Sequence, residues 1–290
     1  MSDTGHLSTC VPPSRPSQPD GGGTPVLALR GATLSLGGRT LWSDLDLEVA
    51  PGEFIAVLGA NGTGKTSLLR AVLGEHDLDS GSIRLLGQPL RRGDRRIGYV
   101  PQQRLIDPSV PVRARDLVAM GIDGHRWGTG LPSARRRERV DRLLDSVGAL
   151  PLADTRIGLL SGGEQQRVRM AQALAGDPRL VLADEPFLSL DLRRQAEISA
   201  LIDEMRRRLG FAILLVTHDI NPILDVVDRV LYLAGGSARL GAPDEVLRSD
   251  VLSELYRSPV EVIRSSGRVL VAGVPETPED ARAHHVEAHR

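Results

Sequence analysis

The chain of 290 residues has a single cysteine, Cys10, and no apolar run that reaches about 18 residues. One cysteine excludes an internal disulfide framework and fits a reducing compartment. The N-terminus lacks the long apolar segment of a signal peptide, and no segment is expected to span a membrane. If the protein works at a membrane, we expect another chain to supply the membrane-embedded part.

An excess of charge of one sign is also lacking, because 36 basic side chains meet 37 acidic ones and the net charge is −1. Neither nucleic acid nor anionic lipid is therefore expected as a partner. Lysine is almost absent, since Lys65 is the only lysine among the 36 basic residues. In a sequence that otherwise uses arginine, this exception indicates a position that needs a slim ammonium group rather than a broad guanidinium.

Apolar residues make up 41% of the chain and fall into short runs that alternate with helical patterns. This alternation predicts an α/β fold with a mainly parallel sheet covered on both faces, interrupted by a helical subdomain at about 103–175. Strands are predicted at 27–36, 45–49, 54–58, 82–86, 97–100, 180–183, 212–217 and 229–233. Helices are predicted at 65–73, 112–120, 133–147, 164–175, 193–208, 243–248 and 250–256.

The two ends of the chain differ from this α/β domain, which we place at 26–257. Residues 1–25 are rich in proline and glycine and are expected to be disordered. Short apolar runs flank Ser265-Ser266-Gly267, which predicts a β-hairpin within 258–274 whose turn needs the glycine. The polar residues 275–290 are expected to form a flexible tail.

A phosphate-binding pattern, G-x-x-x-x-G-K-[ST], is matched by Gly59-Ala60-Asn61-Gly62-Thr63-Gly64-Lys65-Thr66. It follows an apolar strand and opens a helix, the context that this pattern requires. Its glycines allow backbone N–H groups to curl around phosphate oxygens, and the helix N-terminus adds its dipole. Lys65 is expected to reach the β- and γ-phosphates, and Thr66 to offer its hydroxyl to Mg²⁺. The predicted ATP-binding segment runs from Gly59 to Ser67.

Two carboxylates, Asp184 and Glu185, end the apolar run 180–183. In P-loop enzymes the acid at the end of this strand holds Mg²⁺, the role expected for Asp184 through water. Glu185 is expected to orient and deprotonate the attacking water. Binding of both carboxylates to the metal is the alternative assignment.

A second anion-binding pattern is typical of one protein family. Leu160-Ser161-Gly162-Gly163-Glu164-Gln165-Gln166-Arg167 matches the LSGGQ signature of ABC ATPases, with glutamate for the first glutamine. The match lies about 95 residues after the phosphate loop and about 20 before the acidic pair, the order found in that family. The chain resembles an ABC ATPase over about 26–275.

This resemblance implies a P-loop core with an antiparallel β subdomain and an inserted helical subdomain. It also implies a signature that grips the γ-phosphate of ATP held by a partner subunit, through Ser161, Gly162, Gly163 and Glu164. One phosphate loop and one signature per chain then imply two chains arranged head to tail, with two ATP molecules between them.

Three further residues resemble functional elements of the family. Gln102 resembles the Q-loop glutamine, which touches Mg²⁺ and senses the transmembrane partner. Asp191, in Ser189-Leu190-Asp191, resembles the D-loop residue that crosses the dimer interface. His218, about 33 residues beyond Glu185, resembles the switch histidine that contacts the γ-phosphate.

One element departs from the family pattern. In Ser35-Leu36-Gly37-Gly38, leucine occupies the position at which the family usually has an aromatic side chain that stacks on adenine. Because apolar contact then replaces stacking, we expect weaker discrimination between ATP and GTP.

Several segments resemble the ATPases of zinc and manganese importers: 97–102, 110–112, 117–121, 125–128, 185–191, 252–256 and 259–262. The resemblance implies an ATPase that uses ATP and Mg²⁺ to energise metal-ion import, bound peripherally at the cytoplasmic face of the plasma membrane. Its expected partners are a second copy of itself, integral membrane permease subunits and, indirectly, an extracytoplasmic solute-binding protein. Import of another small solute, such as a siderophore or cobalamin, is the alternative.

A soluble ABC ATPase acting on ribosomes or DNA is an alternative from another class. Translation-factor types usually carry two cassettes per chain, whereas this chain has one. The roughly 95 residues between phosphate loop and signature leave no room for the long coiled coil of the chromosome and repair types. The histidines of the tail segment 284–289 have zinc-binding spacing if the tail is helical, but its composition favours a polar, disordered segment.

Overall fold

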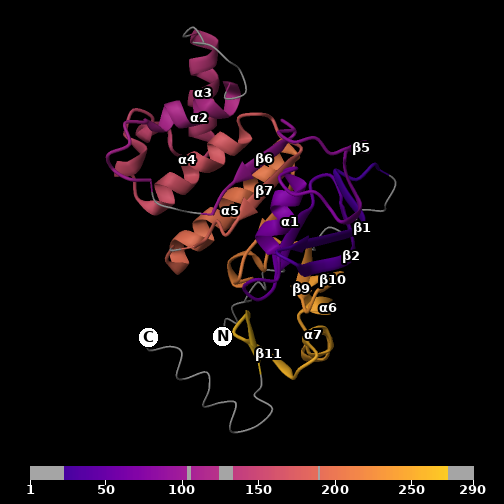
Figure 1. Ribbon diagram of the computed structural model, residues 1–290. Coiled ribbons are helices and arrows are strands. Elements are labelled where there is room, and N and C mark those ends of the chain that lie inside the picture. The colour runs from indigo at the N-terminus through magenta and orange to yellow at the C-terminus, as the bar shows by residue number, and fades with distance from the viewer. Residues whose placement is uncertain (1–22, 103–105, 124–132, 189, 274–290) are drawn as a thin grey trace, which may run out of the picture.

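The computed structural model describes residues 23–102, 106–123, 133–188 and 190–273. A six-stranded sheet in the order β10-β9-β3-β8-β7-β6 forms its centre (Figure 1). The strands β3, β8 and β7 pair in parallel register and are buried along their whole length. Because both faces of these strands are covered, their sequences are continuous apolar runs, as predicted. The six strands are β3 (Phe54–Leu58), β6 (Ile97–Val100), β7 (Leu180–Asp184), β8 (Ala212–Val216), β9 (Arg229–Ala234) and β10 (Ser237–Gly241).

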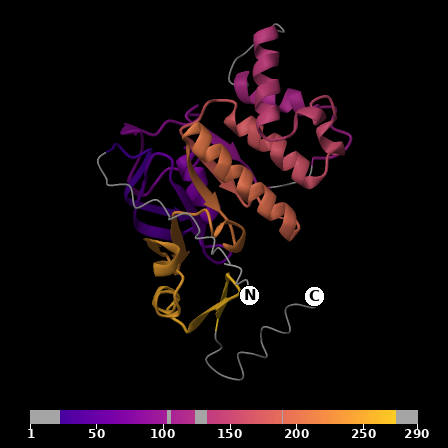
Figure 2. The same ribbon diagram turned by 180° about the vertical axis from the view of Figure 1, so that it is seen from behind.

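Two core clusters lie on opposite faces of this sheet. Ile55 and Val57 of β3 belong to one cluster, and Phe54 and Ala56 belong to the other, because successive strand side chains point to opposite faces. The first cluster joins the sheet to α1 (Lys65–Val72) and to the antiparallel sheet described next. The second joins it to the helical subdomain and to α5 (Leu192–Leu209), the long orange helix of Figure 2.

A second, four-stranded sheet is antiparallel throughout and has the order β2-β1-β4-β5. A tight turn joins β1 to β2. Its residues Gly37 and Gly38 have φ of 60° and 78°, a conformation that favours glycine. The strand predicted at 45–49 therefore begins earlier, since the turn pairs Arg39 with Leu36. This sheet confirms the antiparallel subdomain expected of the fold class. Its strands are β1 (Leu27–Leu36), β2 (Arg39–Val49), β4 (Ser80–Leu85) and β5 (Gln88–Pro89).

Three helices form a separate subdomain, α2 (Ala114–Asp123), α3 (Ala134–Ser146) and α4 (Gly162–Leu174), all seen at the top of Figure 1. Ser133 caps α3 by accepting a hydrogen bond from the backbone N–H of Arg136 at 3.0 Å. A Cβ at Gly121 of α2 would lie 2.3 Å from the carbonyl oxygen of Gln172, so α2 and α4 cross closely because this residue is glycine. All three helices match the predicted ones to within a few residues. Two 3₁₀ turns, Leu150–Leu152 and Ile157–Leu159, connect α3 to α4.

The C-terminal part consists of α6 (Pro243–Val246), α7 (Ser249–Tyr256) and a hairpin of β11 (Val260–Ser265) and β12 (Arg268–Gly273). The predicted hairpin is present, and its turn residues Ser266 and Gly267 both have positive φ, 50° and 75°, as a two-residue turn of type I′ requires. The tail segments 1–22 and 274–290, with the tail histidines, lie outside the described residues. Among the helices that the structure describes, none has the length and apolar character to cross a membrane.

Candidate active site

The predicted phosphate loop joins the end of β3 to the start of α1. Gly59, Gly62 and Gly64 have φ of 143°, 78° and 92°, a region that other residues rarely adopt. A Cβ at Gly59 would lie 2.2 Å from the carbonyl oxygen of Leu233 and 2.9 Å from Oγ1 of Thr63. The loop therefore needs glycine at its first position both for its backbone conformation and for its fit against β9.

Lys65 lies inside this loop and is only 7% exposed. Its Nζ donates hydrogen bonds to the backbone carbonyl oxygens of Gly59 at 2.7 Å and Ala60 at 2.9 Å. Burial lowers the pKa of Lys65, while the nearby charges of Glu185 and Asp184 act in the opposite direction. A compact ammonium fits between the two carbonyl oxygens, which accounts for the single lysine of the chain at this position.

Trp42 supports the loop from outside, a contact that the sequence reasoning missed. A Cβ at Gly64 would lie 3.0 Å from Cδ1 and 3.0 Å from Nε1 of Trp42, which is fully buried on β2. The indole therefore packs directly against the backbone at the start of α1. Its rarity was the available signal, because the chain has only two tryptophans.

Two of the three residues predicted to bind Mg²⁺, Thr66 and Asp184, are in contact. The Thr66 hydroxyl donates a hydrogen bond to Oδ1 of Asp184 at 3.2 Å. Asp184 ends β7 and is 2% exposed. Burial raises the pKa of its carboxyl, whereas the hydrogen bond from Thr66 lowers that pKa. Gln102, the third predicted ligand, is exposed and follows β6, the neighbour of β7 in the sheet.

Glu185 and His218 follow two neighbouring parallel strands, β7 and β8, and meet at their carboxyl ends. Nδ1 of His218 lies 2.8 Å from Oε2 of Glu185. The Glu185 side chain is largely buried, whereas that of His218 is 59% exposed. Glu185 also has φ of 48°, an uncommon conformation for a non-glycine residue, and its N–H donates to the carbonyl of Val216 at 2.9 Å. The arrangement can hold a carboxylate ready to accept a proton from water.

The signature serine, Ser161, is the N-cap of α4 and is tied to Glu164. The N–H and the hydroxyl of Ser161 both donate to Oε2 of Glu164 at 2.8 Å. The two residues form a capping box, and these bonds hold the pKa of the Glu164 carboxyl below its usual range. The signature therefore lies on the helical subdomain, whereas the phosphate loop lies on the core (Figure 1).

Two other predicted residues lie at the ends of secondary-structure elements. Asp191 is the N-cap of α5 and accepts a hydrogen bond from the N–H of Arg194 at 2.9 Å; Ser189 falls outside the described residues. Leu36 ends β1 and is 39% exposed, so its side chain is accessible at the position where an aromatic was expected.

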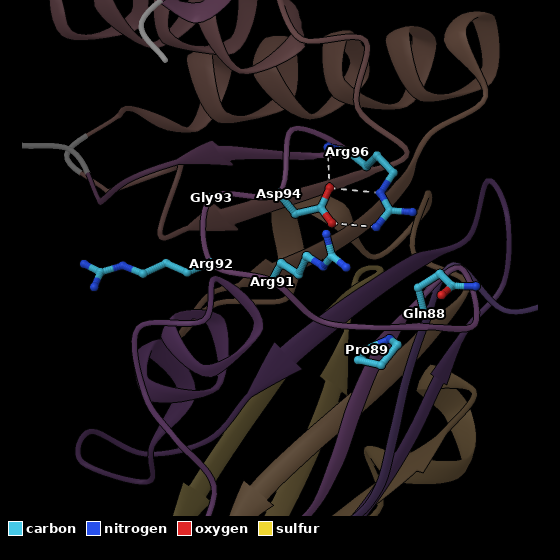
Figure 3. A pocket seen from close by; sticks show the side chains of 7 residues that line it. All are labelled: Gln88, Pro89, Arg91, Arg92, Gly93, Asp94 and Arg96. Carbon is cyan, nitrogen blue, oxygen red and sulfur yellow. Dashed lines mark hydrogen bonds and ion pairs between the residues drawn. The ribbon is translucent and has the colours of Figure 1, made fainter. Parts of the chain in front are cut away.

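A cavity of about 510 Å³ lies apart from the phosphate loop, around the connection from β5 to β6 (Figure 3). Asp94 accepts two hydrogen bonds there from the guanidinium of Arg96, at 2.9 and 2.6 Å. The side chain of Arg91 points toward this pair, and that of Arg92 points away. The pair closes the turn before β6 and thereby fixes where the strand that leads to Gln102 begins.

Comparison with known proteins agrees with these features. Residues 42–188 match the ABC transporter family. The zinc transport system ATP-binding protein TroB of Treponema pallidum is 34% identical over 84% of this chain and 89% of its own length. The Fe(3+) ions import ATP-binding protein FbpC of Streptomyces avermitilis is 39% identical over 77% of this chain and 64% of its own length.

The solved structure of a metal-chelate type ABC transporter in an inward-facing conformation is also similar. Its TM-score is 0.72, with 25% identity, covering 88% of this chain and 99% of the other. The fold and the phosphate loop define an ATP-binding protein of the P-loop class. The chain belongs to the ABC transporter family, and it is an ATPase of that family.

Proposed function

We propose that this chain hydrolyses ATP with Glu185 as the general base and thereby energises the import of a metal ion of the zinc or manganese type. The catalytic part rests on the 2.8 Å contact between Glu185 and His218 at the ends of β7 and β8. Glu185 orients and deprotonates the attacking water, and His218 contacts the γ-phosphate. Lys65, at the centre of the loop, stabilises the charge that develops on the phosphoryl oxygens.

Thr66 and Asp184 would hold Mg²⁺, with Gln102 completing the site. The donor set fits this ion, because Mg²⁺ prefers oxygen ligands. The Asp184 carboxylate is 2% exposed and its hydrogen-bond donor is a neutral hydroxyl, so a cation would compensate its buried charge. When bound, Mg²⁺ neutralises charge on the β- and γ-phosphates.

The active unit in this proposal is a head-to-tail pair of chains. Residues 59–67 of one chain and Ser161, Gly162, Gly163 and Glu164 of the other enclose one ATP, and Asp191 lies at the interface. The separation of phosphate loop and signature onto different subdomains supports this arrangement, since one chain then offers two half-sites. The pair binds integral membrane permease subunits at the cytoplasmic face of the membrane, and an extracytoplasmic solute-binding protein delivers the cargo.

The metal-ion assignment is supported by the zinc-transport relative, which aligns with 84% of the chain. A metal chelate is the second candidate cargo, because the similar solved transporter is of the metal-chelate type. Deleting the gene and measuring cellular uptake of zinc, manganese and a ferric chelate separates the two. We expect loss of zinc or manganese uptake, restored by the wild-type gene but not by Glu185→Gln; selective loss of chelate uptake would favour the second candidate.

The catalytic assignment is tested by Glu185→Gln in the purified protein. The amide keeps the size of the side chain but cannot accept the proton, so we expect ATP hydrolysis to fall by at least about 100-fold. ATP binding should persist, and ATP should convert the variant into a stable dimer visible by size-exclusion chromatography. Hydrolysis at the wild-type rate would show that another residue is the base.

A further inference from the structure

The segment that follows β8 carries His218 and has a short internal hydrogen-bond network. The hydroxyl of Thr217 donates to the carbonyl of Asp219 at 2.9 Å and accepts from the N–H of Asp219 at 3.2 Å. The carboxylate of Asp219 accepts from the backbone N–H and the side-chain Nδ2 of Asn221, at 2.9 and 2.7 Å. His218 is thus an exposed residue within a five-residue segment, 217–221, that β8 fixes at one end and Asn221 at the other.

Asn221 also binds the C-terminal hairpin. Its Oδ1 accepts from the N–H of Val269 at 2.8 Å, and its Nδ2 donates to the carbonyl of Val269 at 3.0 Å. β11 and β12 form a two-stranded sheet, so every second residue of β12 turns its backbone groups away from β11. The side-chain amide of Asn221 pairs with the N–H and the carbonyl of Val269, as a third strand would.

The hairpin itself is anchored by apolar side chains. Val260 of β11 is 7% exposed and Val269 of β12 is 5% exposed, and both belong to the same core cluster as Ile220 and Ile223, which flank Asn221. The outer face carries Leu270, which is 61% exposed. Figure 1 shows the hairpin at the end of the molecule opposite the helical subdomain. An element remote from the signature is therefore attached to the segment that carries His218.

We propose that Asn221 is a positioning residue that ties the C-terminal hairpin to His218 and thereby sets the contact between His218 and Glu185. This inference rests on the proposed role of His218 in hydrolysis. A displacement of the hairpin is transmitted through Val269 and Asn221 to the segment 217–221, because two hydrogen bonds join each neighbouring pair of groups. The hairpin thereby influences the active site by a route that does not pass through the helical subdomain.

The test is a double-mutant cycle on the full chain. Asn221→Ala should lower kcat for ATP on the order of ten-fold, because small misplacements of catalytic groups have effects of at least this size, and should leave KM within about two-fold, since the phosphate loop is untouched. In single-turnover assays, Asn221→Ala should add no further loss to His218→Ala, because both changes act through one group. Additive losses, or an unchanged kcat in Asn221→Ala, would overturn the proposal.

A spectroscopic readout keeps the test decisive if His218→Ala has no measurable rate. The ¹H–¹³C Cε1 resonance of His218, assigned by its absence in His218→Ala, should shift in Asn221→Ala and stay in place in the control Leu270→Ala. An unmoved resonance in Asn221→Ala would overturn the link. Normal hydrolysis by His218→Ala would instead refute the role of His218 in the proposed function, so the two failures are distinguishable.

Discussion

Lys65 and Asp184 are two buried charged groups that lie close together without pairing with each other. Lys65 donates to the carbonyls of Gly59 and Ala60, and Asp184 accepts from the hydroxyl of Thr66. Burial disfavours both charges, since it lowers the pKa of Lys65 and raises that of Asp184. The two opposite charges offset each other in part. A triphosphate with its metal would add further compensation, so ligand binding should stabilise the fold as well as occupy the site.

Leu36 determines the first prediction at the scale of a single residue. Its side chain is 39% exposed and offers apolar contact without an aromatic face, so the wild-type chain should discriminate weakly between ATP and GTP. Leu36→Tyr should raise kcat/KM for ATP by about ten-fold, because stacking of a base on an aromatic side chain contributes roughly 1–3 kcal/mol. Values of kcat/KM for ATP and for GTP measure both this gain and the preference, with Leu36→Ala as the control. An equally strong ATP preference in wild type and Leu36→Tyr would contradict the expectation.

Glu164 gives the second prediction. Its carboxylate accepts from the N–H and hydroxyl of Ser161, the donors that the partner's γ-phosphate is proposed to use. The pKa of Glu164 is lowered by these bonds, so the group is ionised at pH 7 and competes with the phosphate. Glu164→Gln removes the charge but keeps the capping geometry, since glutamine also forms a capping box.

We expect Glu164→Gln to form the ATP-bound dimer at a concentration of ATP roughly three-fold to five-fold lower, corresponding to about 0.6–1 kcal/mol for one charge at a helix N-terminus. The measurement is a titration of dimer against ATP in the Glu185→Gln background, where hydrolysis does not consume the nucleotide. If the glutamine variant needs more ATP, the carboxylate contributes a favourable contact in the closed dimer and the competition argument fails.

At the scale of elements, strands β3, β6 and β1 begin and end where the sequence predicts, because their apolar patterns are local. β10 (Ser237–Gly241) was not predicted. Its sequence has little β propensity, and it forms because Gly235 and Gly236 turn it back onto β9. β5, only Gln88–Pro89, was missed because two residues carry no periodicity.

The residues of the site fall into two similar groups: those that stand in local sequence patterns and those that only the fold brings together. Lys65, Thr66 and Asp184 could be proposed as site residues from the sequence, because each stands in a local pattern next to a strand. The contact between Glu185 and His218 joins residues 33 apart, and it depends on β7 and β8 being neighbours in the sheet, which the order of elements along the chain does not specify. Family resemblance supplied the roles, and only the fold supplied the geometry.

The turn between β5 and β6 carries a prediction on pH. The Asp94 side chain is 8% exposed, and its hydrogen bonds with Arg96 lower the pKa of its carboxyl (Figure 3). A lowered pKa in the folded state stabilises the fold above the ordinary aspartate pKa, and this stabilisation is lost as pH falls through the folded value. Asp94→Asn should lower the free energy of unfolding at pH 7 by about 1–2 kcal/mol.

Denaturant titrations from pH 7 down to about pH 3 measure this difference. It should be constant at higher pH and begin to shrink near the ordinary aspartate pKa of about 4. The matched control is Asp250→Asn, which removes a similar pair with Arg248 between two exposed side chains and should have almost no effect. A difference for Asp94→Asn that is independent of pH down to the acid transition would mean that packing rather than charge explains it.

At the scale of the whole molecule, the two halves of the site lie on different subdomains. The phosphate loop extends from the sheet, and Ser161 begins a helix of the helical subdomain. The N–H and the hydroxyl of Ser161 donate to Glu164 in the same helical turn. A nucleotide held by Lys65 of one chain is therefore proposed to receive its signature from a second chain, and closed two-fold symmetry makes both sites equivalent.

Mixing two inactive variants tests this arrangement. Lys65→Ala removes the loop ammonium, and Gly163→Asp places a negative charge at the signature. A Cβ at Gly163 would make an ordinary van der Waals contact with Cδ of Arg194 at 3.7 Å. Each variant alone has two damaged sites per dimer and should be inactive. In a head-to-tail pair of unlike chains, both changes fall in one site and the other site is intact. An equimolar mixture should thus regain about a quarter of the wild-type rate if chains exchange freely and the sites act independently, whereas a site built within one chain would leave the mixture inactive.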